Sequence, residues 1–371
     1  MLQRLYIDNF LCFVNFEYKP EQKQLLLGAN GSGKSSLLDA IRFLKKFVAG
    51  GENPFTQFTR TRWQNLPLQV FELEAVLNEE KYEYRVEIGF EAKAGSQSLH
   101  LERLKVSGDV VFEYSNEKIS FYSNDSAHAT TVPLATQKSA LQLSKLSNQH
   151  VRRFMEWMDA VYCFRLDVYP GKMDESTSSP EDVPDYELEN FPALYLDMVQ
   201  SYPEKNVAFL KAAQDAIEGL QTLRFSTGED GMRNLRVDFS APGKGVNNRR
   251  NIVSYDLSEL SDGQRCLLGL YFVLSAYIAN GHTVFIDEPD NFVSLREIQP
   301  WLLAAEQMVE ASNSQLILIS HHPEILNQWA VAYGLRFFRE ENGHVRTEKF
   351  KPDTEGMLQP SELIARGWEN G

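Results

Sequence analysis

The period of the hydrophobic pattern changes along the chain, and each change marks a different kind of element. Over residues 37–48, leucine, isoleucine and phenylalanine recur at helical spacing, which predicts an amphipathic helix. From residue 68 the period becomes two, with polar turns between the segments, and this predicts an antiparallel meander rather than a βαβ series. The expected strands of the meander are 70–77, 82–90, 98–106, 110–114 and 119–122.

Short apolar runs mark a second kind of strand. Residues 25–27, 283–287 and 315–319 read as strands of a parallel sheet that are buried on both faces. Together with the helical segments, they predict an α/β fold with a parallel-sheet core, a flanking antiparallel sheet and a mainly helical insert. The other expected elements are strands at 4–7 and 12–18, a hairpin of 222–226 with 235–239, and helices at 134–161, 191–202, 204–220 and 266–279.

The turn after residues 25–27 carries the strongest chemical signal. From Gly28 to Ser35 it fits G-x-x-x-x-G-K-[ST], between an apolar strand and an amphipathic helix. Its glycines let backbone N–H groups converge at a helix N-terminus, which suits a polyphosphate. Lys34 is expected to reach the β- and γ-phosphates, and the Ser35 hydroxyl to join the shell of a Mg²⁺ ion. The expected nucleotide-binding residues are Gly28, Asn30, Gly31, Ser32, Gly33, Lys34, Ser35 and Ser36.

Two later strands end in residues suited to phosphate chemistry. The run 283–287 ends in Asp287, expected to hold Mg²⁺ through its water shell, and is followed by Glu288, expected to orient or deprotonate the attacking water. The run 315–319 is followed by Ser320-His321-His322-Pro323, where His321 is preferred over His322 as the residue that senses the γ-phosphate.

A glutamine is a further candidate to reach the metal and the attacking water. Gln64 and Gln69 both lie just before the meander, and the sequence leaves the choice between them open.

Length and composition limit the classes of protein to which the chain can belong. A chain of 371 residues exceeds the usual size of a single core, so we expect two lobes or one large domain with an insertion. The net charge of −14 argues against wholesale wrapping of nucleic acid, although it permits a local basic patch. We expect a cytoplasmic protein without a membrane partner, because no signal-peptide pattern or membrane-spanning run is apparent.

The order of the motifs resembles that of a known family. The segment Leu260-Ser261-Asp262-Gly263-Gln264 stands between the phosphate loop and the Asp-Glu strand, and the histidine strand follows. This order is similar to the head of ABC-type ATPases of the RecF and structural-maintenance-of-chromosomes class, and within it to the AAA15 and AAA21 families, which are similar to overcoming-lysogenization-defect proteins. The opening Tyr6-Ile7-Asp8-Asn9-Phe10 also resembles this group.

The resemblance implies a mechanism in which two copies form a head-to-tail homodimer or a larger homo-oligomer around ATP and Mg²⁺. The residues Ser261, Gly263 and Gln264 of one copy close on the nucleotide at Lys34 of the other. The resemblance further implies that Glu288 acts as the base, that His321 acts as the switch, and that Asp290 begins a loop across the interface.

The resemblance also implies an organisation and a role. Residues 1–371 form one ATPase head, with an N-terminal lobe at 1–125, a mainly helical insert at 126–245 and a C-terminal lobe at 246–371. The expected function is an ATP-hydrolysing switch for a partner effector, a nuclease or toxin, in bacterial anti-phage defence. The alternative is a DNA-binding ATPase of repair or genome maintenance, and a basic stripe would favour it.

Overall fold

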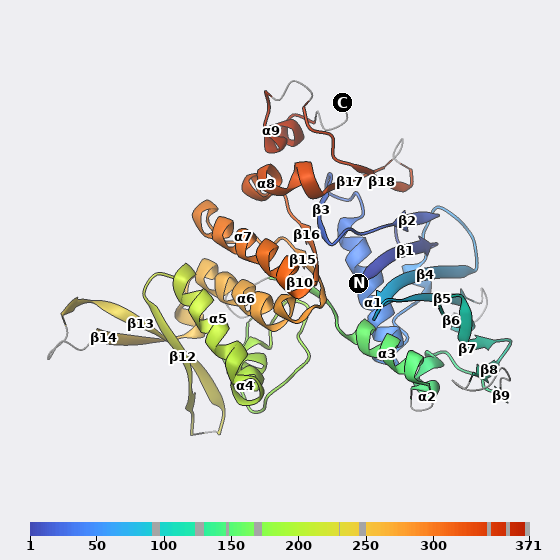
Figure 1. Ribbon diagram of the computed structural model, residues 1–371, viewed down its shortest axis with the longest axis horizontal. Helices are drawn as coiled ribbons and strands as arrows, with labels where there is room; N and C mark the ends of the chain where they lie inside the picture. The colour runs from blue at the N-terminus through green and yellow to red at the C-terminus, as the bar shows by residue number, and fades with distance from the viewer. Residues whose placement is uncertain are drawn as a thin grey trace. The chain divides into compact units, whose positions relative to one another are not determined.

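The computed structural model describes residues 1–90, 97–122, 130–145, 148–166, 173–229, 231–244, 250–339, 343–353 and 357–367 (Figure 1). The chain folds into two compact units, and the residues of each unit contact one another. Each unit combines two stretches of sequence. Unit 1 comprises Met1–Tyr162 and Ala332–Phe350, and unit 2 comprises Cys163–Val331 and Lys351–Gly371. The lobes expected at 1–125, 126–245 and 246–371 stay a prediction, and the middle segment holds strands as well as helices.

Unit 1 contains an antiparallel sheet in the strand order β2-β1-β4-β5-β6-β7-β8-β9. Buried and half-buried side chains alternate along β4, so one face of the sheet is covered, as a period of two requires. The predicted meander is therefore confirmed, and β1, β2 and β9 extend it. The strands are β1 (Leu2–Asp8), β2 (Phe16–Tyr18), β4 (Leu68–Leu77), β5 (Glu80–Phe90), β6 (Gln97–Val106), β7 (Asp109–Ser115), β8 (Lys118–Phe121) and β9 (Thr130–Pro133).

Two local predictions in unit 1 are wrong. Of the strand expected at 12–18, only the last three residues, which are β2, are extended. Leu11 and Asn15 have positive φ values of 46°, which interrupt an extended backbone before β2. The helix expected at 134–161 is confined to α2 (Leu141–Ser144) and α3 (Gln149–Asp159). Asn148 is the reason for the late start of α3, because its side chain accepts hydrogen bonds from the first N–H groups of that helix.

A parallel strand pair also lies in unit 1. Strand β3 (Lys23–Leu27) is buried along its whole length and pairs in parallel with β17 (Gly334–Arg339), which pairs antiparallel with β18 (Val345–Lys349). Helix α1 (Lys34–Val48) follows β3, starts three residues before the predicted helix, and buries its predicted apolar face. A short 3-10 helix, η1 (Gln57–Thr59), precedes β4.

Unit 2 contains a second parallel pair. Strands β15 (Thr283–Asp287) and β16 (Gln315–Ile319) are fully buried and pair in register, with Asp287 opposite Ile319. Strand β10 (Val161–Arg165) and helix α8 (Pro323–Tyr333) lie where the chain passes between the units. The other helices of unit 2 are α4 (Phe191–Ser201), α5 (Pro203–Ala216), η3 (Leu257–Glu259), α6 (Asp262–Ala276), η4 (Ile278–Asn280), α7 (Leu295–Ser312) and α9 (Pro360–Ala365).

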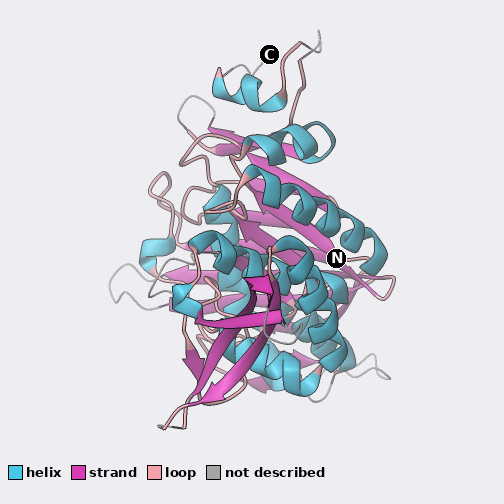
Figure 2. Cartoon of the chain, turned by 90° about the vertical axis from the view of Figure 1, so that its left-hand side faces the viewer, coloured by secondary structure: helices cyan, strands magenta, loops and turns pink. Residues whose placement is uncertain are grey.

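An antiparallel sheet completes unit 2. Strands β12 (Leu220–Thr227) and β13 (Arg233–Lys244) form the predicted hairpin, and β11 (Ser176–Thr177) and β14 (Arg250–Asp256) add to it. Long strands of this sheet extend away from the helices of the unit (Figure 1 and Figure 2). The helix expected at 204–220 ends at Ala216, because Ile217 is already extended, and Gly219 with a φ of 81° then turns the chain into β12.

The predicted α/β fold class is confirmed, since both parallel and antiparallel pairs occur with helices in between. In the described part of the chain, no helix has the length and apolar character that crossing a membrane requires.

Candidate functional site

The turn between β3 and α1 has a backbone that favours glycine at two positions. Gly28 has a φ of +134°, and a Cβ there would lie 2.2 Å from the carbonyl oxygen of Phe337. Gly33 has a φ of +111° and is the N-cap of α1. Since glycine offers no side-chain acceptor to the first N–H groups of the helix, this end of α1 suits an anion.

Lys34 lies over this turn. Its side chain is buried, and its ammonium donates hydrogen bonds to the carbonyl oxygens of Gly28 at 2.6 Å and Ala29 at 3.2 Å. The hydroxyl oxygen of Ser32 is also buried and has no hydrogen-bond partner within the described ranges. A buried hydroxyl without a partner is costly, and an anion held in the turn would supply its acceptor. The turn therefore fits a phosphate group.

The predicted nucleotide-binding residues of this turn all lie together in unit 1. Asn30, Gly31 and Ser35 are exposed at the turn, and Ser36 is half-buried. Arg339, at the end of β17, adds a contact that the sequence did not indicate, because its Nε donates to the carbonyl oxygen of Gly31 at 2.9 Å. No local pattern marks this arginine, which reaches the turn only through the pairing of β17 with β3.

The predicted carboxylates lie at the end of β15 in unit 2. Asp287 is buried as the last residue of the strand, and the next residue, Glu288, has a strained φ of +52°. The N–H of Glu288 donates to the carbonyl oxygen of Ile319 at 2.8 Å, which ties the turn to the end of β16. Its carboxylate accepts a hydrogen bond from Asn291 at 3.1 Å and lies 4.0 Å from the guanidinium of Arg165. Glu288 thus has a fixed backbone and an accessible carboxylate.

Asp290 connects this turn to the histidine segment. Its carboxylate accepts a hydrogen bond from the hydroxyl of Ser320 at 2.6 Å, and the same hydroxyl accepts from the N–H of His322 at 2.9 Å. Burial raises the pKa of Asp290, and the Ser320 hydrogen bond opposes that rise. From the sequence, Asp290 was expected only to begin a loop, because its hydrogen-bond partner Ser320 lies thirty residues further along the chain.

The two histidines differ in their surroundings. His322 is half-buried, and its Nδ1 accepts a hydrogen bond from the N–H of Glu324 at 3.2 Å, so it serves the first turn of α8. His321 is exposed next to it.

The predicted segment around Ser261 forms the start of α6. Ser261 is the N-cap, and it forms a reciprocal capping box with Gln264, whose N–H donates to the serine hydroxyl at 3.2 Å. A Cβ on Gly263 would lie 2.8 Å from the carbonyl oxygen of Phe292, so only glycine fits this contact. Within unit 2, the start of α6 therefore lies directly against the turn that follows Glu288.

The two candidate glutamines differ in their burial and in their hydrogen-bond partners. Gln69 is fully buried in β4, where its amide donates to the carbonyl oxygen of Asn9 at 2.9 Å and accepts from the Thr59 hydroxyl at 3.2 Å. Gln64 is half-buried and donates to the carboxylate of Asp8 at 3.0 Å. Both glutamines lie in unit 1 with Lys34, whereas Asp287, Glu288, Ser261 and His321 lie in unit 2.

Comparisons with known proteins give a family and a fold likeness. The sequence model of AAA_21, described as "AAA domain, putative AbiEii toxin, Type IV TA system", matches residues 25–327. No curated protein sequence matches the chain. The head domain of SMC from Thermotoga maritima is a similar solved structure, with 14% identity, coverage of 95% of this chain and 99% of that one, and a TM-score of 0.48. The Smc head domain of Pyrococcus furiosus, solved with an extended coiled coil and bound to the C-terminal domain of ScpA, has 10% identity, coverage of 100% and 99%, and a TM-score of 0.47.

Proposed function

The chain belongs to the AAA_21 family of AAA domains, and from this premise we propose that the protein binds and hydrolyses ATP with Mg²⁺. The observation that carries the proposal is the phosphate loop. Its glycines take positive φ values that other residues rarely adopt, the Lys34 ammonium lies over the turn, and the buried Ser32 hydroxyl lacks an acceptor among the described residues. These groups hold the β- and γ-phosphates of the nucleotide.

Ser35 and Asp287 are the residues that would hold Mg²⁺. A hydroxyl and a carboxylate are the hard oxygen ligands that this ion prefers, and nucleotide sites often supply only one or two protein ligands beside the phosphates. When bound, Mg²⁺ neutralises negative charge on the phosphate oxygens. Ser35 belongs to unit 1 and Asp287 to unit 2.

Glu288 is the general base of the proposed reaction. Its carboxylate accepts a proton as water attacks the γ-phosphorus, the bond to the β-phosphate oxygen breaks, and ADP and phosphate leave. The hydrogen bond from Asn291 and the nearby Arg165 orient this carboxylate. His321 hydrogen-bonds the γ-phosphate, since the ring of His322 is already engaged at the start of α8.

The active form in this proposal contains two copies arranged head to tail. Ser261, Gly263 and Gln264 of one copy face the γ-phosphate held by Lys34 of the other. Ser261 and Gln264 currently bond each other in the capping box, so closure exchanges those hydrogen bonds for bonds to phosphate. Asp290 begins the loop that reaches across the interface.

A complementation assay tests this arrangement. Lys34→Ala removes the phosphate ligand and Ser261→Arg blocks the facing surface, so each variant alone should lose ATP hydrolysis. In a mixed dimer, the Ser261→Arg copy supplies Lys34 and the Lys34→Ala copy supplies Ser261, so one complete site forms and activity partly returns. The matched control mixes Lys34→Ala with Lys34→Ala/Ser261→Arg, a pair that forms no complete site. Activity that does not return in the first mixture would contradict the head-to-tail site.

We further propose that the ATPase is a cytoplasmic switch for a partner effector in anti-phage defence. The family description, "putative AbiEii toxin, Type IV TA system", connects the family with toxin–antitoxin systems, which supports a role in a system of two components. The test is affinity purification of Glu288→Gln with Mg-ATP, followed by mass spectrometry. The purification is repeated without nucleotide. A second protein retained in a stoichiometric ratio only with Mg-ATP supports the switch, and the absence of any such protein with and without Mg-ATP contradicts it.

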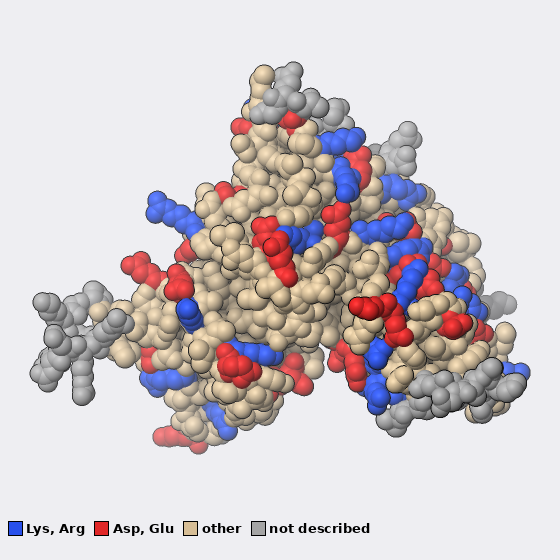
Figure 3. Space-filling model, in the orientation of Figure 1, with Lys and Arg blue, Asp and Glu red and all other residues tan. Residues whose placement is uncertain are grey.

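The alternative function, a DNA-binding ATPase of repair, has less support from the described surface. Arginines of the unit 1 sheet are paired with carboxylates, as Arg4 is with Glu72 at 2.8 Å and Arg103 with Glu113 at 2.7 Å. Figure 3 shows basic and acidic side chains mixed on the visible face rather than a basic stripe. DNA phosphates would have to displace these carboxylates. ATP-dependent retention of duplex DNA by Glu288→Gln would favour the alternative.

A further inference from the structure

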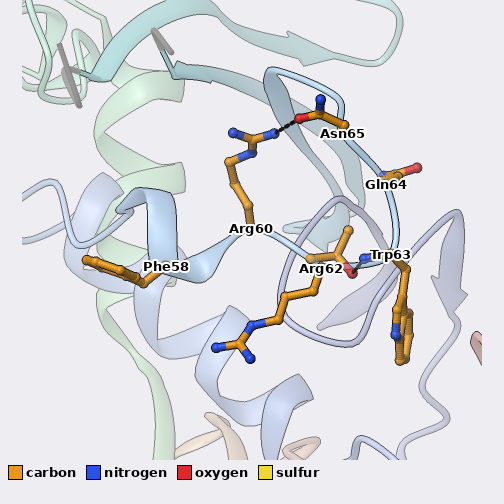
Figure 4. Close-up of a pocket in the computed structure, with 7 residues that line it drawn as sticks. Phe58, Arg60, Arg62, Trp63, Gln64 and Asn65 are labelled. Atoms are coloured by element: carbon orange, nitrogen blue, oxygen red, sulfur yellow. Dashed lines mark hydrogen bonds between the residues drawn. The ribbon is translucent and has the colours of Figure 1, made fainter. Parts of the chain in front are cut away.

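The segment between α1 and β4 forms a surface pocket of about 600 Å³ in unit 1 that the proposed mechanism does not use. In Figure 4, Arg60 points toward Asn65, whereas Arg62 and Trp63 extend from the other side of the loop. We refer to this feature as the loop pocket, and its lining residues are Phe58, Arg60, Thr61, Arg62, Trp63, Gln64 and Asn65.

Arg339 connects the loop pocket with the phosphate loop. Its Nε donates to the carbonyl oxygen of Gly31 at 2.9 Å, and its guanidinium carbon lies 4.9 Å from the centre of the Trp63 ring. The three residues belong to the same unit, so these contacts do not depend on the placement of unit 2. A molecule whose phosphates lie in the turn at Gly31 therefore has the Trp63 ring as its neighbour.

The chemistry of the loop pocket suits a flat, polar aromatic group. Trp63 is 41% exposed and Phe58 is 82% exposed, although burial of such rings is favourable. Arg62 is exposed, and its guanidinium has no hydrogen bond or ion pair to any residue that the structure describes. The amide of Gln64 donates to Asp8, and the amide oxygen of Asn65 accepts from Arg60 on the other side of the loop from Trp63 (Figure 4). The exposed aromatic rings and Arg62 remain as the groups that can stack on a nucleobase.

We propose that the loop pocket binds the base and ribose of the nucleoside triphosphate whose phosphates lie at Gly28–Ser35. The base stacks against Trp63, Arg62 faces the ribose and the α-phosphate, and Arg339 holds the ring and the phosphate loop together. This inference rests on the proposed function, since it assigns the remainder of the same ligand. The ring of His344, 5.6 Å from that of Trp63 and tilted by 59°, supports the indole from a second direction.

The test compares ligands with and without a base. ATP and inorganic tripolyphosphate, each with Mg²⁺, are titrated by calorimetry into wild type, Trp63→Ala, Trp63→Phe and Leu66→Ala. Leu66 is the matched control, because it is an exposed apolar residue of the same segment that does not line the pocket. We expect Trp63→Ala to weaken ATP binding by about ten- to a hundredfold, the usual effect of losing one aromatic–base stack. Trp63→Phe should recover most of that loss.

Tripolyphosphate has no base, so its affinity should be the same in all four proteins. ATP affinity that is unchanged in Trp63→Ala, or tripolyphosphate affinity that falls in parallel with it, would overturn the assignment of the pocket. Lys34→Ala distinguishes this failure from failure of the proposed function, since it should weaken both ligands. If Trp63→Ala weakens binding of single-stranded DNA while ATP affinity is unchanged, the pocket is a nucleic-acid site and the base assignment is wrong.

Discussion

Replacement of the buried Glu102 with glutamine is expected to change how the stability of the protein depends on pH. Glu102 lies on β6, is fully buried, and accepts hydrogen bonds from the hydroxyls of Tyr84 at 2.8 Å and Ser139 at 2.6 Å and from the N–H of Ala140 at 2.6 Å. Burial raises its pKa to about 7 from an ordinary value of 4.5, and the three hydrogen bonds only partly oppose that rise.

The sign of the effect follows from proton binding. Between pH 4.5 and about 7 the unfolded chain has lost the Glu102 proton while the folded protein retains it, so raising the pH favours unfolding. The interval corresponds to a loss of about 3 kcal/mol of unfolding free energy. Above pH 7 both states are ionised at this position, and the contribution becomes constant.

Glutamine keeps the size of this side chain and does not titrate. Its amide oxygen can accept from Ala140, and its amide nitrogen can donate to the hydroxyls of Tyr84 and Ser139. Urea unfolding of wild type and Glu102→Gln at half-unit steps from pH 4.5 to 8 measures the difference. The variant should gain about 3 kcal/mol relative to wild type across that range.

The matched control is Glu156→Gln, which removes the same charge from an exposed position on α3. Its stability difference from wild type should not follow the Glu102 profile. A Glu102→Gln difference that stays constant from pH 4.5 to 8 would refute the reasoning, because Glu102 would then titrate alike in both states.

Two further substitutions test the geometry of the turns. Gly28→Ala should destabilise unit 1 and abolish ATP binding, because its Cβ would lie 2.2 Å from the carbonyl oxygen of Phe337. Gly31→Ala should cost only about 1–2 kcal/mol of stability in a thermal unfolding assay, because no atom lies within 4 Å of a Cβ at that position. Equal stability losses would contradict this difference. Ser320→Ala should lower stability by about 1–3 kcal/mol and slow ATP hydrolysis, because the half-buried Asp290 loses its donor, whereas Ser320→Thr should retain both properties.

Local patterns predicted those parts of the fold and site that depend on neighbouring residues. The apolar strand, glycine turn and amphipathic helix around Lys34 follow one another within a short stretch. Each of them has its own local sequence pattern. The meander was equally predictable, because alternation along each strand decides which face is buried. The position of Asp287 at the end of a buried strand was predictable for the same reason, and its role stays a prediction.

Contacts between distant segments were not predictable from these patterns. Arg339 reaches Gly31 across 308 residues, and Ser320 reaches Asp290 only because β15 and β16 are neighbours. The helix expected at 134–161 failed because apolar residues at helical spacing do not reveal that the Asn148 side chain starts a helix there. Single-sequence periodicity holds no information about such partners, so side-chain networks required the structure.

The central claim is that two copies close around ATP, and the mass of Glu288→Gln in solution tests it most directly. Light scattering with size-exclusion chromatography should give a monomer without nucleotide and a dimer or larger assembly with Mg-ATP. The double variant Lys34→Ala/Glu288→Gln should stay monomeric under both conditions. A Glu288→Gln protein that binds ATP but keeps the same mass with and without it would contradict the account.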